Sequence, residues 1–138
     1  MAMAADGTLW LQPNNTDVLL QYRDDAVGTV RSPLAEGERG RLLADDQGQV
    51  WMSSSQRVMR LGEEGLAETL RVDEVGGQVN VIRHGQDGSR WFGHSMGVSS
   101  QHQADWTHLS REDGVPLGEL RDLMLEPDGT VWIGTYGG

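Results

Sequence analysis

The sequence contains no cysteine and no lysine, and only 6 % of its residues are aromatic. Without cysteine the chain can form no disulfide framework, thiolate zinc site or cysteine nucleophile. All 11 basic residues are arginine, so neither a Schiff-base lysine nor the lysine of a phosphate-binding loop is present. These absences exclude several common kinds of catalytic and structural centre.

Long hydrophobic runs are also missing, so the sequence offers no segment that would span a bilayer. The first residues do not combine a basic stretch with an apolar one, as a secretory signal would. The formal net charge is −10, which does not suit the phosphate backbone of a nucleic acid. The sequence therefore argues against an integral membrane protein and against a nucleic-acid-binding protein.

Glycine is abundant, at 19 of 138 residues, and it marks a repeat. Four of the five tryptophans stand in the same short motif, with glycine three positions earlier and a large apolar residue directly after. Their spacings are 41, 40 and 41 residues, and the four are Trp10, Trp51, Trp91 and Trp132. An apolar residue also stands nine positions before each of the last three, at Leu42, Ile82 and Leu123.

A unit of about 41 residues has room for four short strands. In the third unit the sequence predicts strands at residues 78–84, 89–94, 98–101 and 105–110, with Asp87-Gly88 as a hairpin turn. Residues 63–72 could form a short helix, but Gly65 and the repeat favour strand and turn. Consecutive apolar residues such as those at 131–133 indicate strands buried on both faces. Sheets stacked around an axis, as in the blades of a β-propeller, satisfy this pattern.

Residues 123–138 resemble the two-component regulator propeller repeat, in which an acidic turn and glycine lead into leucine-tryptophan-isoleucine-glycine-threonine. The stretch 108–115, followed by Pro116, resembles the lead-in to that family's next blade. The resemblance is sharp at Trp132 and Trp91, whereas the first two copies lack the glycine-threonine pair and carry Gln12-Pro13 and Ser53-Ser54.

The resemblance implies an extracytoplasmic or periplasmic sensor region of a hybrid histidine kinase or a diguanylate cyclase. Its implied role is recognition of a small molecule, often a carbohydrate, and signalling across the membrane. This role follows from the fold and the repeat, and not from any site in the sequence.

One motif suggests an enzyme. Residues 93–97 fit the Gly-x-Ser-x-Gly nucleophile elbow around Ser95, and Asp105 and His108 follow in the required order. In the repeat, however, Ser95 falls at a turn between two blade strands, and no amphipathic helix follows it. The chain is also too short for the doubly wound sheet that this motif needs. We therefore interpret Ser95 as a turn residue.

The remaining polar candidates favour structural interpretations. The four histidines, His84, His94, His102 and His108, lack the spacing of a metal site. His94 and His102 flank one hairpin and could approach each other, and His84 could line the central channel. The acidic pairs Asp45-Asp46, Glu63-Glu64 and Glu112-Asp113 are expected to be solvated turn residues. We expect the four repeat tryptophans to be buried between blades, which leaves Trp106 as a possible exposed contact.

Residues 1–138 correspond to about 3.4 units, so we expect an all-β partial β-propeller of about three four-stranded antiparallel blades, cut open at both ends. Such an array is either a fragment of a larger propeller or part of a ring that two copies complete, and in either case we expect a homo-oligomer that covers the open blade faces.

The function we predict is a non-catalytic ligand- or partner-sensing segment of a bacterial signalling receptor, with no catalytic residue, cofactor or metal site. The alternatives are a fragment of a propeller-type lyase or hydrolase, and a purely structural interaction scaffold.

Overall fold

The computed structural model describes residues 1–13, 18–62, 65–114 and 120–135. They form an almost entirely β structure, in which the helical segments are α1 (Val72–Val75) and η1 (Arg111–Asp113). No helix in these residues is long and apolar enough to cross a membrane. The chain divides into two compact units, residues 1–70 and 71–138.

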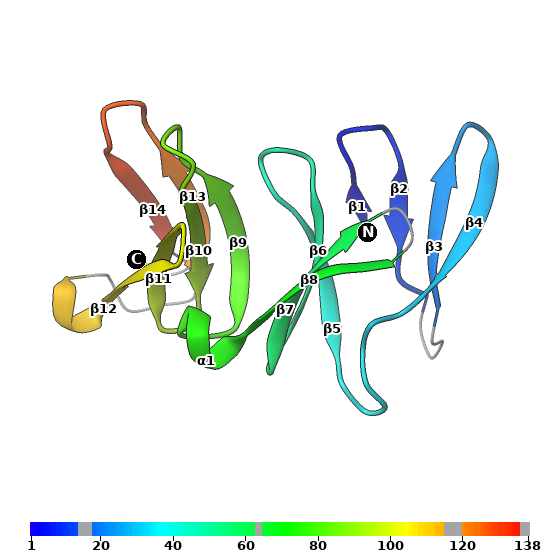
Figure 1. Cartoon of the computed structure of the whole chain (residues 1–138), viewed down its shortest axis with the longest axis horizontal. Helices are drawn as coiled ribbons and strands as arrows, with labels where there is room; N and C mark the ends of the chain where they lie inside the picture. Colours follow the sequence, from blue (N-terminus) through cyan, green and yellow to red (C-terminus); the bar gives the residue numbers. More distant parts are fainter. Residues whose placement is uncertain (14–17, 63–64, 115–119, 136–138) are drawn as a thin grey trace. The chain divides into compact units, whose positions relative to one another are not determined.

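The first unit holds two four-stranded antiparallel sheets, each with its strands in chain order (Figure 1). The first sheet consists of β1 (Ala2–Met3), β2 (Leu9–Leu11), β3 (Val18–Arg23) and β4 (Ala26–Arg31). The second consists of β5 (Gly40–Ala44), β6 (Val50–Ser54), β7 (Arg57–Gly62) and β8 (Gly65–Arg71), whose last residue belongs to the second unit.

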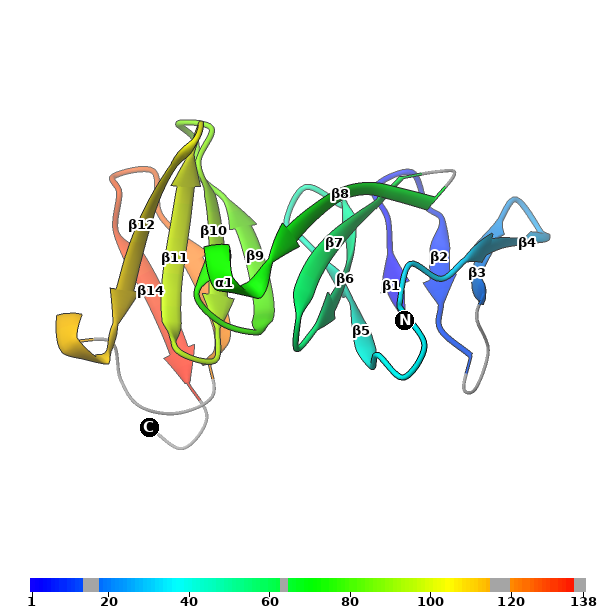
Figure 2. The ribbon, with the colours of Figure 1, turned by 60° about the horizontal axis from the view of Figure 1, so that its bottom comes forward.

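The second unit repeats this plan. Its four-stranded sheet consists of β9 (Val79–His84), β10 (Arg90–His94), β11 (Gly97–His102) and β12 (Asp105–Ser110), and these strands lie side by side in Figure 2. A two-stranded sheet pairs β13 (Leu120–Leu125) with β14 (Val131–Thr135). The expected all-β fold of about three four-stranded sheets is confirmed.

Residues 65–71 form strand β8, so the strand interpretation of this region is confirmed, with a one-turn helix following it and residues 63–64 lying outside the described residues. In the first unit a short strand precedes Trp10, because Ala2 and Met3 pair with Trp10 and Leu9. The sequence of methionine and alanine before Trp10 does not by itself predict a strand. These residues are extended because their backbone pairs with that of β2.

The turn before each repeat tryptophan is built in the same way. The glycine three positions earlier has a positive φ, between 75° and 91°, in all four turns: Gly7, Gly48, Gly88 and Gly129. The residue six positions before the tryptophan donates its backbone N–H to the carbonyl two positions before it, at 2.8–2.9 Å in each case. Glycine is required here because its missing Cβ permits this backbone conformation.

Each sheet has a tryptophan face, which holds the repeat tryptophan, and a flanking face, which holds the residues directly before and after it. In the first unit, Trp10 and Leu19 on the tryptophan face of the first sheet pack with a flanking-face set of the second: Leu42, Val50, Met52, Met59 and Leu61. In the second unit, Trp91 packs in one cluster with Leu123, Val131 and Ile133 of the β13–β14 sheet. Within each unit, the tryptophan face of one sheet thus packs against the flanking face of the sheet that follows it in the chain.

Candidate functional site

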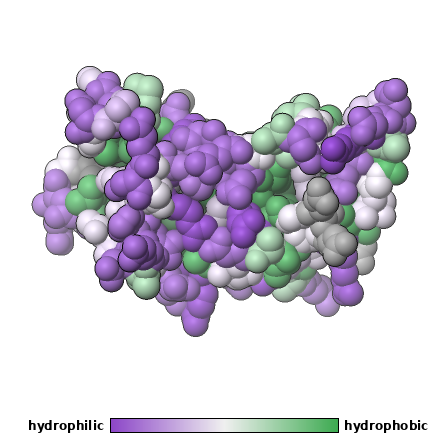
Figure 3. Space-filling model, turned by 45° about the horizontal axis from the view of Figure 1, so that its top comes forward, coloured by the Kyte–Doolittle hydropathy of each residue, from purple (hydrophilic) through white to green (hydrophobic). Residues whose placement is uncertain are grey.

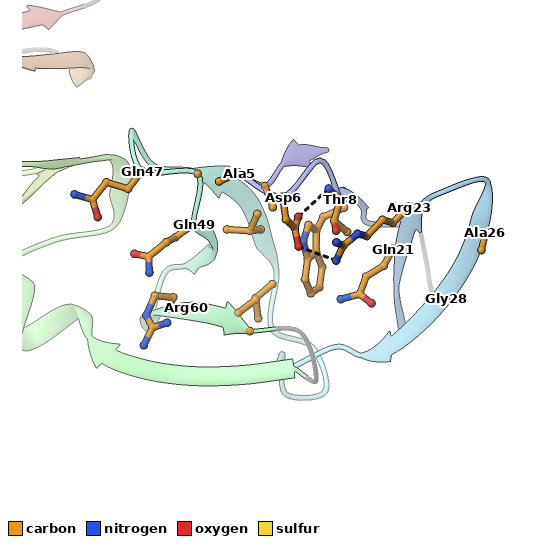
Figure 4. Close-up of a pocket in the computed structure, with 16 residues that line it drawn as sticks. Ala5, Asp6, Thr8, Gln21, Arg23, Ala26, Gly28, Gln47, Gln49 and Arg60 are labelled. Carbon is orange, nitrogen blue, oxygen red and sulfur yellow. Dashed lines mark hydrogen bonds and ion pairs between the residues drawn. The ribbon is translucent and has the colours of Figure 1, made fainter.

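A cleft of about 570 Å³ lies between the two sheets of the first unit (Figure 4). It is lined by the turns before Trp10 and Trp51, together with residues of β3, β4 and β7. Residues at equivalent repeat positions of the two sheets line it together. Asp6 and Gln47 each stand four residues before a tryptophan, and Thr8 and Gln49 each stand two residues before one.

Asp6 is the acidic group of the cleft. Its Oδ1 accepts the backbone N–H of Thr8 at 2.9 Å, and its Oδ2 pairs with Arg23 Nη1 at 3.2 Å. The Thr8 backbone N–H lowers the pKa of the Asp6 carboxyl, with smaller contributions from the Thr8 hydroxyl and Arg23. The carboxylate therefore stays ionised and paired across the neutral range.

The other polar groups in the cleft lining include three carboxamides, Gln21, Gln47 and Gln49, and one further cation, Arg60. Arg60 Nε pairs with Glu68 at 3.2 Å, so its charge is also balanced. Trp10 forms part of the floor, but only 3 % of it is exposed. The cleft thus offers balanced charges and amide groups, and no aromatic ring open for stacking.

Several of these cleft residues lie in or beside the tryptophan repeat motif, but the sequence did not predict their polar side chains as a binding site. The repeat could have indicated them, because turn residues at equivalent repeat positions lie at the same edge of neighbouring sheets. The packing of the two sheets then determined which of those turns enclose a cavity.

In the second unit two histidines converge on a buried serine. Ser99 Oγ lies 2.8 Å from His94 Nε2 and 2.7 Å from His108 Nδ1, and it donates to the backbone carbonyl of Val75. His94 is only 4 % exposed, whereas His108 is exposed and stacks on Trp106 with an interplanar angle of 6°.

The hydrogen bonds of this cluster determine which nitrogens of the two histidine rings carry a proton. The backbone N–H of Met96 donates to His94 Nδ1 at 3.1 Å, so the proton of neutral His94 is on Nε2 and points to Ser99. The Ser99 hydroxyl donates to Val75, so it must accept from His108 Nδ1. Burial, with a smaller effect of His108, lowers the pKa of His94 to about 4. His94 is therefore neutral and fully hydrogen-bonded at neutral pH.

The nucleophile-elbow interpretation fails in the structure as the repeat predicted. Ser95 lies in the turn between β10 and β11, and its Oγ accepts the backbone N–H of Gln78 at 3.2 Å. Strand β11, and not a helix, follows Ser95. Asp105 pairs with His102 at the far end of β11, away from the turn that holds Ser95.

The other histidines do not join the cluster. His94 pairs with Gly97 at one end of the β10–β11 hairpin, whereas His102 ends β11 and contacts the Asp87 carbonyl at 3.2 Å. The idea that His94 and His102 approach each other is therefore wrong, because the hairpin register separates them. His84 ends β9 opposite Arg90.

The acidic pairs divide into two kinds. Asp113 is exposed and accepts the backbone N–H of Ser110 at 2.9 Å, Glu112 is also exposed, and Asp46 is exposed, all as expected for turn residues. Asp45 contradicts the expectation, because it is 7 % exposed and its Oδ2 accepts Trp51 Nε1–H at 2.9 Å. The carboxylate serves to hold the indole. Glu63-Glu64 lies outside the described residues.

The repeat tryptophans are not all buried. Trp10 and Trp51 are buried and Trp91 is half-buried, but Trp132 is 57 % exposed, which corrects the expectation for that position. Among the described residues no sheet covers the tryptophan face of β14. Trp106 is half-buried, with its ring centroid 5.6 Å from that of Phe92.

Comparison with solved structures identifies similar folds. The extracellular domain of a hybrid two-component system from B. thetaiotaomicron is 15 % identical, with a TM-score of 0.52 over 92 % of this chain and 20 % of that one. A streptogramin B lyase is 16 % identical, with a TM-score of 0.58 over 95 % of this chain and 45 % of that one. A catalytically inactive histidine-to-alanine variant of virginiamycin B lyase from Staphylococcus aureus, bound to quinupristin, is 14 % identical, with a TM-score of 0.59 over 99 % and 55 %.

The chain thus spans 20 to 55 % of the length of these structures. No family model matches the sequence, and no curated protein matches it either. Membership in the two-component regulator propeller repeat family stays a prediction. The expected fold is confirmed: the chain is an all-β partial β-propeller.

Proposed function

We propose that this chain is a recognition segment of a propeller receptor, and that its ligand is an uncharged polyhydroxylated small molecule of the carbohydrate class. The observation that carries the proposal is the cleft of about 570 Å³ between the first two sheets. The role is binding without catalysis, and it involves no cofactor and no metal ion.

The chemistry of the cleft supports this ligand class. Carboxamides both donate and accept hydrogen bonds, so Gln21, Gln47 and Gln49 match hydroxyl groups, which do the same. The ion pair of Asp6 and Arg23 offers directional acceptors and donors without net charge. A charged ligand would find no uncompensated charge of opposite sign among these groups.

The similarity to the extracellular domain of a hybrid two-component system supports an extracytoplasmic receptor as the setting. We propose that the whole protein passes ligand occupancy to a kinase or cyclase domain. The coding sequence on either side of this segment tests that setting, since a membrane-spanning helix followed by such a domain is expected there. Flanking sequence that completes a propeller lyase instead would contradict the receptor function.

The cleft is tested by isothermal titration calorimetry with a panel of neutral oligosaccharides and a matched set of uronic-acid oligosaccharides. We expect binding of a neutral member that weakens at least tenfold in Gln49→Ala and in Gln47→Ala. Gln56→Ala is the matched control, because Gln56 is an exposed carboxamide outside the cleft. Absence of binding across the panel, or equal loss in the control, would refute the assignment.

A second candidate function is that of a lyase, favoured by the convergence of His94 and His108 on Ser99 and by the two lyase folds. His108 is the accessible member, and its Nδ1–H is held by Ser99. The test incubates the chain with quinupristin and follows its loss by liquid chromatography. Loss that disappears in His108→Ala would favour the enzyme, and a stable ligand favours the binding role.

A further inference from the structure

The first sheet of the chain exposes an apolar flanking face. Strand pairing aligns Leu9 with Tyr22 and Leu11 with Leu20, as it aligns Val50 with Leu61 and Met52 with Met59 in the second sheet. In the second sheet these four residues are at most 6 % exposed, because the first sheet covers them.

Within the described part of the chain, no sheet covers the equivalent residues of the first sheet. Tyr22 is 41 % exposed, and Leu9, Leu11 and Leu20 are half-buried. The same face continues to Met3 and Val27, which pair in the row of Leu9 and Tyr22 and are 54 % and 65 % exposed. The described residues that pairing and alternation place on this face include no acidic one, although the chain carries a net charge of −10.

The β13–β14 sheet exposes the opposite kind of face. Trp132 and its cross-strand partner Met124 are both 57 % exposed on the tryptophan face. The other face of this sheet is covered, since Leu123 is 1 % exposed and Val131 and Ile133 pack in the core of the second unit. Exposed clusters of large apolar side chains usually mark interaction sites.

These two open faces are complementary by the packing rule that the chain itself follows. Within each unit, a tryptophan face packs against the flanking face of the next sheet, once around Trp10 and once around Trp91. A free tryptophan face and a free flanking face are therefore the two halves of a contact that the sequence already encodes twice.

We propose that the tryptophan face of β13–β14 binds the flanking face of β1–β4 of a second copy of this chain. The contact is heterologous, because it joins two different surfaces, and it extends the stack of sheets from one copy to the next. Trp132 is the central anchor, and the rows Leu9–Tyr22 and Leu11–Leu20 supply its pocket. The partner is this chain itself, since it presents both surfaces.

The test uses two variants that each block one face. Leu20→Arg spoils the flanking face and keeps Trp132, whereas Trp132→Arg spoils the tryptophan face and keeps Leu20. We expect light scattering after size exclusion to give assemblies for the wild type and 15.2 kDa monomers for either variant alone. An equimolar mixture of the two variants should form a 1:1 dimer, because one intact face of each kind remains.

Two controls keep the result interpretable. Met96→Arg changes an exposed methionine in the β10–β11 turn, 67 % exposed, outside both faces, and should leave the assembly unchanged. Far-UV circular dichroism checks that each variant is folded. A monomeric wild type, single variants that still assemble, or a mixture that stays monomeric would each overturn the proposal.

Discussion

At the scale of single residues, Glu38 of the first unit is held by several hydrogen bonds, and its side chain is 3 % exposed. Both of its carboxylate oxygens bind Arg57, at 2.8 and 3.1 Å, and it also accepts hydrogen bonds from Ser54 Oγ and the backbone N–H of Ala35. These contacts, with Arg57 first, lower the pKa of Glu38 from 4.5 to about 2. The network fixes the loop between the first two sheets to the β6–β7 turn.

Replacing Glu38 by glutamine should therefore destabilise the protein at neutral pH by roughly 2–3 kcal/mol. Because the folded pKa is depressed, this stabilisation is present above about pH 4.5 and is lost as the pH falls toward 2. Urea unfolding across that range measures the effect, and Glu36→Gln, at an exposed carboxylate two residues away, is the control. Equal stability of the two variants would contradict the assignment.

We expect a second loss of stability, at higher pH than that of Glu38, through protonation of His94. Its pKa is lowered from 6.5 to about 4, so the stability linked to neutral His94 is present above pH 6.5 and is lost as the pH falls toward 4. Protonation would also place an N–H on Nδ1, facing the N–H of Met96. Between about pH 7.5 and 5 the wild type should lose about 2 kcal/mol through this group.

The measurement is urea unfolding of the wild type, His94→Gln and His102→Gln at both pH values. His94→Gln should flatten the pH dependence, whereas His102→Gln, at an exposed position, should retain it. A steep pH dependence in His94→Gln would assign the sensitivity to another group.

At the scale of elements, close packing of neighbouring sheets depends on Gly93 of β10. A Cβ there would overlap the side chains of Leu120 and Val81, which pack in the core of the second unit. Gly93→Ala should therefore destabilise by about 1–3 kcal/mol, through strain in a filled core. Thermal unfolding gives the comparison with Gly28→Ala in β4, where the nearest atom to the new Cβ is 3.9 Å away. A neutral Gly93→Ala would contradict this packing.

The strands themselves were largely predictable. In the third repeat the expected and observed strands agree at four of their eight ends and differ by one residue at the other four, because the turn glycines and apolar positions recur in phase. The carboxylate of Asp45 was not predictable as a buried group, since an acid in a turn is normally solvated. Its burial follows from its hydrogen bond to the Trp51 indole.

At the scale of the whole molecule, an acidic chain with a net charge of −10 also exposes apolar side chains. Figure 3 shows hydrophilic side chains over much of one side of the molecule, with hydrophobic side chains gathered in patches. Two copies that each carry a charge of −10 repel one another at long range. Apolar contact and charge repulsion therefore oppose each other in self-association.

Salt should consequently strengthen the association of copies. Raising the ionic strength from about 0.01 to about 0.1 M shortens the screening length from ~30 to ~10 Å, which removes most of the repulsion and leaves the apolar contact unchanged. Light scattering at fixed protein concentration should report a larger mean mass at the higher salt. A mass that falls with salt would indicate an ionic interface and would contradict the apolar contact.

The sequence by itself determined the repeat, the strand positions of the third unit and the all-β propeller fold, because backbone turns and apolar periodicity are local properties that a linear pattern records. Only the tertiary structure decided which turn residues enclose a cleft, that Asp45 is buried, and that Trp132 is exposed while Trp10 is covered. These outcomes depend on which sheet face meets which neighbour. Such contacts join residues some 40 positions apart in the sequence. Because the repeat units have similar sequences, the sequence pattern does not distinguish a unit whose tryptophan is covered from one whose tryptophan is exposed.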